Sequence, residues 1–213
     1  MSRLMKRCQP RSSRYGIRLL LPIICVCVSA CAGGKQPTRE ASNNDLVRFE
    51  ASTMELRKLS QGGDASAQNE LGLLYYEGKG IPQDHRKAKE WFDKAVEQGH
   101  AGAQVNLGTL YLRGEGAPQS SQMALFWFTR AAAQEDALAF AKLGSMYAQG
   151  RGVLQDFIQA HMWYNLSAAH GEPRSADARD ALAKQMMPAQ IAEAQRLARE
   201  WRPREEKSRK TVY

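Results

Sequence analysis

Histidine and cysteine, which often act as bases, nucleophiles or metal ligands near neutral pH, are sparse in this chain of 213 residues. A zinc hydrolase motif places two histidines one helical turn apart around a glutamate, and a thiol redox site places two cysteines three residues apart. Neither spacing occurs. The histidines lie far apart along the chain, at His85, His100, His161 and His170. The sequence therefore predicts no catalytic residue, no metal site and no cofactor.

Two recurring patterns could still suggest ligand sites. Gly78 and Gly80 are spaced like glycines of a phosphate-binding loop, and Trp91-Phe92 could offer a stacking surface to a sugar or a base. Phosphate loops follow a strand, however, whereas these glycines follow an apolar stretch with helical spacing. The aromatic pair stands beside alanines, again at helical spacing. We therefore expect turn glycines and core aromatics.

Both patterns belong to a longer segment that returns twice at a step of 36 residues. A fixed period of this length is typical of stacked repeats, in which each unit buries its apolar face against its neighbours. The recurring positions are Leu71-Gly72, Leu107-Gly108 and Leu143-Gly144; Tyr75, Tyr111 and Tyr147; Gly78/Gly80, Gly114/Gly116 and Gly150/Gly152; and Trp91-Phe92, Trp127-Phe128 and Trp163-Tyr164.

Each unit is predicted to form two helices. In the first unit, Asp64 is placed to cap a helix from Ala65 to Glu77, and Gly78 stands where that helix must end. Asp84 then precedes a second apolar stripe, which predicts a helix from about Lys87 to Gln98. The sequence thus predicts an all-α protein built from antiparallel helix pairs.

The repeated positions resemble the Sel1-like repeat, a relative of the tetratricopeptide repeat. Its motif runs A-x-A-x-x-x-L-G-x-x-Y-x-x-G-x-G-V, followed by A-x-x-W-Y/F-x-x-A-A-x-x-G. The second unit departs from this motif, because Ser120 replaces a capping Asp and Glu135 replaces the closing Gly. The resemblance covers residues 46–201 and implies a right-handed superhelical solenoid with three Sel1-like repeats, at 64–99, 100–135 and 136–171.

Both ends of the array are expected to be capped, as repeat proteins require. An N-terminal capping helix is expected within 46–63, and C-terminal capping helices within 172–201. The segment from Met187 to Ile191 resembles the closing helix of many bacterial Sel1-like proteins, which usually have Thr where Met187 stands.

The N-terminus has the composition of an export signal. Residues 1–30 carry six basic residues and no acid, and the apolar stretch from Leu19 to Ala30 is only 12 residues long. Val28-Ser29-Ala30-Cys31 resembles a bacterial lipobox, whose cysteine receives diacylglycerol and becomes the new N-terminus. The resemblance implies a lipoprotein signal peptide at 1–30, lipidation of Cys31 and a flexible tether at 31–45. A plain secretory signal cut after Ala30 is the alternative.

A lipoprotein signal peptide implies that the protein is located in the cell envelope. By analogy with known lipoproteins, Ala32 after the cysteine favours the outer membrane, with the protein facing the periplasm. The four cysteines stand at positions 8, 25, 27 and 31, so the repeats contain none and we expect no disulfide.

The net charge of +8 comes from the two ends of the chain. Residues 46–201 hold 17 basic and 18 acidic residues, whereas residues 202–213, which are expected to form a basic disordered tail, hold five basic and two acidic ones. A nucleic-acid-binding domain would need a basic face. We therefore expect no nucleic acid partner.

The first helix of each unit has one face that the packing positions leave free. Asn69, Tyr76, Arg113 and Gln149 are the polar or aromatic candidates for partner binding on this face, and Val105 is placed there too. Resemblance to tetratricopeptide-type proteins implies that the face lines a concave groove for a peptide or a partner helix of another envelope protein. The function expected is a non-enzymatic scaffold. The alternative is a periplasmic hydrolase, or a binder of cell-wall fragments or β-lactams, on the same fold.

Overall fold

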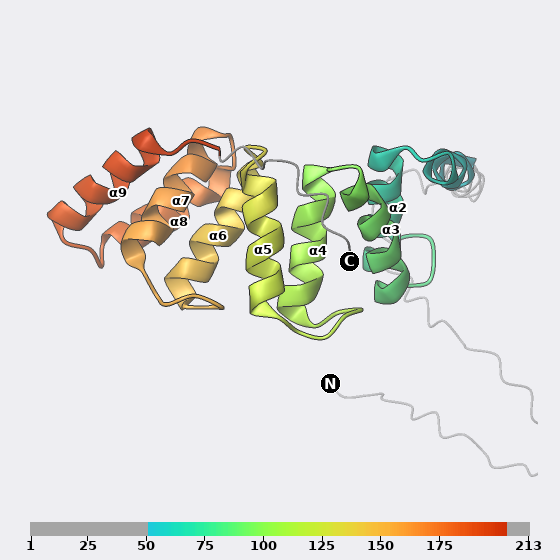
Figure 1. Ribbon diagram of the computed structural model, residues 1–213, viewed down its shortest axis with the longest axis horizontal. Coiled ribbons are helices and arrows are strands. Elements are labelled where there is room, and N and C mark those ends of the chain that lie inside the picture. Colours follow the sequence, from blue (N-terminus) through green and yellow to red (C-terminus); the bar gives the residue numbers. More distant parts are fainter. Residues whose placement is uncertain (1–50, 204–213) are drawn as a thin grey trace, which may run out of the picture. The chain divides into compact units, whose positions relative to one another are not determined.

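The structure is a computed structural model that describes residues 51–203, and in this part of the chain every regular element is a helix. Residues 51–61 are helical, and eight further helices follow (Figure 1). Their bounds are α2 Ala65–Glu77, α3 His85–Glu97, α4 Ala101–Arg113, α5 Ser121–Ala132, α6 Ala137–Gln149, α7 Phe157–Ala169, α8 Pro173–Ala183 and α9 Pro188–Glu200. The predicted all-α class is confirmed. The signal peptide at 1–30, the lipidation site Cys31, the tether at 31–45 and all but the start of the basic tail lie outside the described residues.

The first helix of each unit starts at a side-chain cap and stops at a glycine. The Asp64 carboxylate accepts a hydrogen bond of 2.7 Å from the backbone N–H of Ala67, which would otherwise lack a partner at the start of α2. In the second unit the Nδ1 atom of His100 does the same for Ala103 at 3.1 Å. Gly78 ends α2 with a φ of 69°, in the left-handed region that glycine adopts without strain.

The second helix of the first unit begins slightly earlier than predicted, at His85 rather than near Lys87. The reason is that Asp84 accepts hydrogen bonds from the backbone N–H groups of both Arg86 and Lys87. These bonds, with that from Lys87 contributing most, hold the pKa of the Asp84 carboxyl below its usual value. Ser120 replaces this Asp in the second unit and still caps α5, because its hydroxyl accepts from the N–H of Met123.

In each unit, a glycine of the first helix lies directly against an aromatic ring of the second helix. A Cβ atom built on Gly72 would lie 2.5 Å from the ring of Phe92, and one on Gly108 would lie 2.7 Å from the ring of Phe128. The third unit repeats the contact between Gly144 and Tyr164, at 2.8 Å. Such distances are far inside van der Waals contact, so the aromatic ring of the second helix fills the space that a larger side chain would need. The aromatic residue after each tryptophan is therefore a packing residue.

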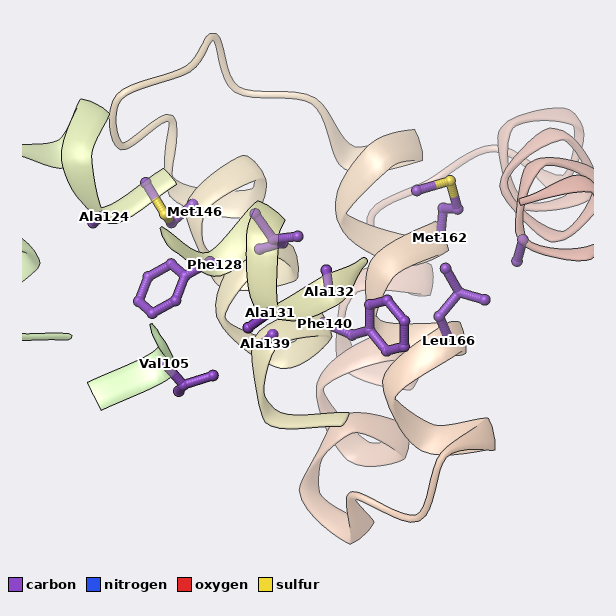
Figure 2. Close-up of a cluster of buried hydrophobic side chains, with 12 residues drawn as sticks. Val105, Ala124, Phe128, Ala131, Ala132, Ala139, Phe140, Met146, Met162 and Leu166 are labelled. Carbon is purple, nitrogen blue, oxygen red and sulfur yellow. The ribbon is translucent and has the colours of Figure 1, made fainter. Parts of the chain in front are cut away.

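The core continues across the boundaries between units. Figure 2 shows one cluster that draws side chains from α5, α6 and α7, with Phe128 and Phe140 fully buried. Val105 belongs to this cluster and is only 2% exposed. Its placement on the free face of the first helix was therefore wrong. Position 105 of α4 faces α5 of the same unit and α6 of the next, so its apolar side chain is buried.

Two further contacts join successive units. A Cβ atom on Gly116 would collide with the backbone carbonyl oxygen of His85, at the start of the preceding unit's second helix. A Cβ atom on Gly152 would lie 2.8 Å from the Cβ atom of Ser121 and 3.0 Å from its backbone carbonyl oxygen.

Within a unit, Gln98 donates to the buried Gln68 at 2.8 Å. The second unit repeats this amide pair, whereas the third replaces it with an edge-to-face contact between Phe140 and His170.

The C-terminal helices cover the apolar side of the third unit. Trp201 meets the rings of Phe140 and Trp163 edge-on, at centroid distances of 5.1 and 6.0 Å. Met187, the residue before α9, provides no side-chain cap. The side-chain carbonyl oxygen of Gln190 instead accepts a hydrogen bond of 2.9 Å from the Met187 backbone N–H. Half of a capping box therefore replaces the missing Thr. Of the helices between residues 51 and 203, none has the length and apolar character that a bilayer crossing requires.

Candidate partner-binding face

We call the outward surface of α2, α4 and α6 the A face, and define it by Asn69, Tyr76, Arg113 and Gln149 with their polar neighbours. Asn69 and Tyr76 are half-buried, whereas Arg113 and Gln149 are exposed. The core of each unit uses the opposite side of these helices, as at Leu71, Leu107 and Leu143. Side chains on the A face are therefore free to differ between units without harming the packing.

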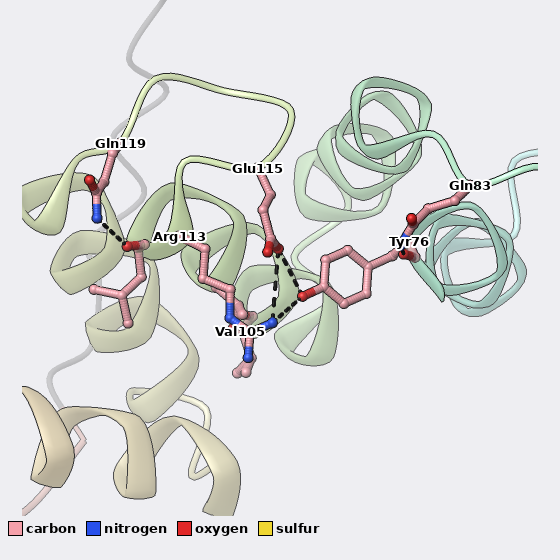
Figure 3. A network of polar contacts seen from close by, with 8 residues as sticks. Tyr76, Gln83, Val105, Arg113, Glu115 and Gln119 are labelled. Carbon is pink, nitrogen blue, oxygen red and sulfur yellow. Dashed lines mark hydrogen bonds and ion pairs between the residues drawn. The ribbon is translucent and has the colours of Figure 1, made fainter. Parts of the chain in front are cut away.

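The structure brings Tyr76 and Arg113 together, although they stand in different units. Arg113 Nη1 donates to the Tyr76 hydroxyl oxygen at 2.6 Å, and the hydroxyl donates to Glu115 Oε2 at 2.9 Å (Figure 3). Arg113 Nη1 also lies 3.9 Å from Glu115 Oε2. Partial burial, followed by the hydrogen bond to Glu115, raises the pKa of Tyr76, and the charge of Arg113 opposes the rise. The phenol therefore stays neutral and fixed in position at physiological pH.

Asn69 also makes a contact across the boundary between the first two units. Its side-chain oxygen accepts a hydrogen bond of 2.9 Å from the Asn106 amide of α4. Three of the predicted residues, Asn69, Tyr76 and Arg113, thus hold α2 and α4 together at the surface. Their polar groups are oriented in advance, which lowers the entropy lost when a partner binds.

Gln149 is not part of this network. Its amide donates to the Ser145 hydroxyl within α6, at 3.0 Å. Ser145 also connects Tyr164 to this region. Burial raises the pKa of the Tyr164 hydroxyl, and a hydrogen bond with Ser145 has a smaller lowering effect on it. The structure therefore divides the four predicted residues into a network across the first boundary and a separate polar group on α6.

Two residues of the network were missed by sequence reasoning. Asn106 carried no signal beyond its polar type. Glu115 did carry one: it stands between the paired turn glycines, where the other units have Lys79 and Arg151. A reversal of charge at an otherwise basic repeat position indicates a local partner, which proves to be Tyr76 together with Arg113.

A charged side chain also lies on α6 beside Ser145. Lys142 is half-buried, and its burial lowers the pKa of its amine. The positive charge of Arg113 lowers it further, whereas Glu172 has a smaller raising effect. Each of these two cations thus has a carboxylate acting on it, Glu115 on Arg113 and Glu172 on Lys142.

A surface pocket of about 250 Å³ lies away from the A face, at the start of α7. Its lining includes Asp156, whose carboxylate accepts from the backbone N–H of Gln159 and so caps α7. The remaining lining residues are Gln155, Phe157, Ile158 and Gln190. Between residues 51 and 203, no group of three or more His, Cys, Asp or Glu side chains is arranged to hold a metal ion.

Comparison with known proteins identifies the architecture. The family model described as Sel1 repeat matches residues 65–100, 101–136 and 137–172. These units begin one residue after the expected boundaries at 64, 100 and 136. No curated protein matches the chain.

Two solved structures are similar to this chain. One is a protective antigen present in uropathogenic Escherichia coli strains, with an SLR fold; it is 33% identical with a TM-score of 0.64, and the match covers 68% of this chain. The other is a Sel1 repeat protein from Oxalobacter formigenes, 30% identical with a TM-score of 0.59, matched over 72% of this chain. The chain spans only 31% of the first protein and 65% of the second.

The family match and the observed helix pairs agree in period and in register, because each matched range holds one pair of helices. Sel1 repeats are generally non-catalytic modules for protein–protein interaction. With three consecutive units over residues 65–172, this chain belongs to the Sel1 repeat family.

Proposed function

We propose that this protein is a non-enzymatic scaffold that binds a peptide or a partner helix on its A face and is held by lipidated Cys31 at the outer membrane, facing the periplasm. The observation that carries the binding part is the network of Tyr76, Arg113 and Glu115, which crosses the boundary between two units on a partly exposed surface.

The network suits recognition because of its residue types and its rigidity. Tyrosine and arginine are enriched among the few residues that supply most of the binding energy at interfaces. Tyr76 is held by two hydrogen bonds and by contact with the ring of His85, at 5.2 Å between centroids. A partner therefore meets side chains whose rotamers are already selected.

The non-enzymatic part of the proposal is supported by the way the polar residues of the repeats are used. Asp84, Asp136 and Asp156 accept backbone hydrogen bonds as helix caps, and Ser120 does the same. A carboxylate or hydroxyl that caps a helix is committed to structure and is a poor general base or nucleophile.

Changing Tyr76 and Arg113 together to alanine should abolish capture of the partner. The test is crosslinking in intact envelopes, followed by pull-down with the wild type and with the Tyr76→Ala/Arg113→Ala variant. A matched control, Arg86→Ala/Glu90→Ala, changes two exposed residues on α3. We expect the same partners from the control and the wild type, and none from the A-face variant, which should lose some stability with the contact between α2 and α4 but remain folded at the assay temperature. Equal recovery with all three proteins would rule out the A face as the binding surface.

The anchor makes a separate prediction, because it depends on Cys31 alone. Wild-type protein should incorporate labelled palmitate and partition into membranes, whereas Cys31→Ser should remain unprocessed or soluble. Two or three acyl chains hold a protein firmly, at about 0.8 kcal/mol per buried methylene. A mature wild-type protein that begins at residue 31 without incorporated label would reject the lipoprotein assignment and leave the binding proposal intact.

A further inference from the structure

We propose that the pocket at the start of α7 is a docking site for a turn of a separate repeat protein, in which a helix ends in Gly-x-Gly beside apolar residues. The lining of this pocket contains no residue of the A face. The inference therefore goes beyond the proposed function and does not depend on it.

Inside the array, the start of a second helix is covered by a glycine turn of the following unit. A Cβ atom on Gly116 would collide with the backbone carbonyl oxygen of His85, the first residue of α3. One on Gly152 would lie 2.8 Å from the side chain of Ser121, the first residue of α5. Both glycines have positive φ values, of 70° and 73°. This surface therefore accepts a glycine turn and excludes a residue with a side chain at the contact.

The corresponding surface of the third unit lacks a following turn. Helix α8 begins at Pro173, one repeat length after Ala137 at the start of α6. The connection from α8 to α9, however, covers only residues 184–187 and contains no glycine, whereas that from α6 to α7 covers residues 150–156. Within the described residues 51–203, the start of α7 therefore borders a pocket of about 250 Å³ in place of a turn.

This open site is more apolar than its two occupied counterparts. Helix α7 starts with Phe157 and Ile158, whereas α3 starts with His85-Arg86 and α5 with Ser121-Gln122. Phe157 and Ile158 are half-buried: they pack against a cluster that includes Leu182 of α8, and they also line the pocket. Apolar residues of an incoming turn would therefore gain free energy by burial at this site.

Two exposed apolar side chains flank the pocket. Leu154, which directly precedes the lining residue Gln155, is 90% exposed. Met187 is 64% exposed, and its backbone N–H donates to Gln190, another lining residue. The amide N–H groups of Gln190 make no hydrogen bond with any other residue from 51 to 203, so they can donate to the backbone of an occupant. Exposed apolar side chains around a pocket with a few polar groups are typical of protein interfaces.

The test uses the full chain in a mild detergent and a synthetic peptide that covers Leu143–Leu154, with both ends blocked. A photoreactive leucine replaces Val153 of the peptide, which carries the turn that the protein itself packs against Ser121. After illumination, mass spectrometry locates the labelled residues. We expect labels within residues 155–158 or 186–190, and competition by the peptide without the photoreactive group.

A change in the peptide tests the turn itself. Replacing its Gly152 by alanine should reduce labelling roughly tenfold, because the turn needs a positive φ and a close backbone contact at this position.

Changes in the protein test the pocket. Ile158→Arg copies Arg86 of the first unit and should abolish labelling, because it puts a charged side chain into the apolar part of the site. Leu154→Ser alters a side chain that already lies in solvent, so it keeps the fold and should still weaken labelling. Leu138→Arg changes an exposed leucine at the other end of α6; it is the matched control and should behave as the wild type.

Four results would overturn the inference. No labelling, or labels that do not depend on Ile158 and on the peptide glycine, would reject the site. Stronger labelling after Val212→Ser/Tyr213→Ser would show that this chain's own C-terminal residues occupy the pocket. Self-association of the protein alone in sedimentation experiments, lost in Ile158→Arg, would assign the pocket to a second copy. Loss of labelling in Tyr76→Ala/Arg113→Ala would place the peptide on the A face; unchanged labelling there keeps the two proposals separate.

Discussion

At the scale of single residues, Glu135 occupies a backbone conformation that the neighbouring units assign to glycine. Its φ is 60°, and the equivalent Gly99 and Gly171 also have positive φ values. An L-residue with a side chain pays for this conformation with about 1–2 kcal/mol of steric strain. Its carboxylate lies 3.9 Å from His170 Nε2, a contact that is largely exposed and offsets little of the strain.

Glu135→Gly should therefore raise the free energy of unfolding by about 0.5–1 kcal/mol, after allowing for the greater freedom of glycine in the unfolded chain. Urea unfolding of the wild type and the variant measures this difference. Glu135→Ala keeps the Cβ atom and removes the carboxylate, so it separates the two causes. If the alanine variant gained as much stability as the glycine variant, the backbone strain would not be the reason.

At the scale of helices, Gly108 and Gly102 provide a matched pair on α4. Alanine gains about 1 kcal/mol of helix propensity at Gly108, in the middle of the helix, and less at Gly102, in its first turn. A Cβ atom on Gly102 would lie 3.2 Å from the His100 ring and 3.8 Å from the Asn69 amide, whereas one on Gly108 would lie 2.7 Å from the buried Phe128 ring. We expect Gly102→Ala to be neutral or stabilising and Gly108→Ala to lose about 1–3 kcal/mol through overpacking.

Thermal or urea unfolding of the two variants checks this expectation. Phe128→Leu in the Gly108→Ala background should recover part of the loss, because the smaller side chain leaves room for the new methyl group. Equal stabilities of Gly108→Ala and Gly102→Ala would mean that the helix crossing lies elsewhere.

These helices also show what the sequence can and cannot predict. The packing of Gly72, Gly108 and Gly144 against an aromatic ring was predictable because each unit must solve the same contact with the same residues. Positions that differ between units carry no such constraint. Val105 was therefore assigned to the free face although it is buried, and the hydrogen bond between Asn69 and Asn106 was not foreseen. A contact between units depends on how far one pair is rotated from the next, and a repeated motif does not encode that angle in any single residue.

At the scale of the whole described array, His161 links stability to pH. Its side chain is only 2% exposed, and among residues 51–203 its Nδ1 atom has no hydrogen-bond partner. The equivalent positions in the first two units hold Lys89 and Leu125. Burial lowers the pKa of His161 below its usual value, and the positive charge of Arg179 adds to the effect, whereas Asp180 opposes it. The unfolded chain therefore binds a proton at a higher pH than the folded protein does.

Stability should consequently fall as the pH drops through the unfolded value near 6.5, because protons favour the unfolded state in this range. Unfolding free energies of the wild type, measured from about pH 7.5 to about pH 5.5, should show this decrease. His161→Leu, which copies the residue of the second unit, should show a shallower dependence whatever its absolute stability. Parallel curves for the two proteins would assign the dependence to other groups.

The close fit of Gly116 against the start of α3, repeated by Gly152 against α5, has a consequence for how the gene can change. An internal duplication of residues 101–136 would place the copied Gly116 against the start of α5, the helix end that Gly152 contacts in the present array. Such a recombination event would lengthen the protein by whole units while preserving its two end caps. A duplication that is not a whole number of repeats would shift the glycines out of register and place a residue with a side chain in this close contact. Selection can therefore adjust copy number, and with it the reach of the molecule, in steps of one repeat.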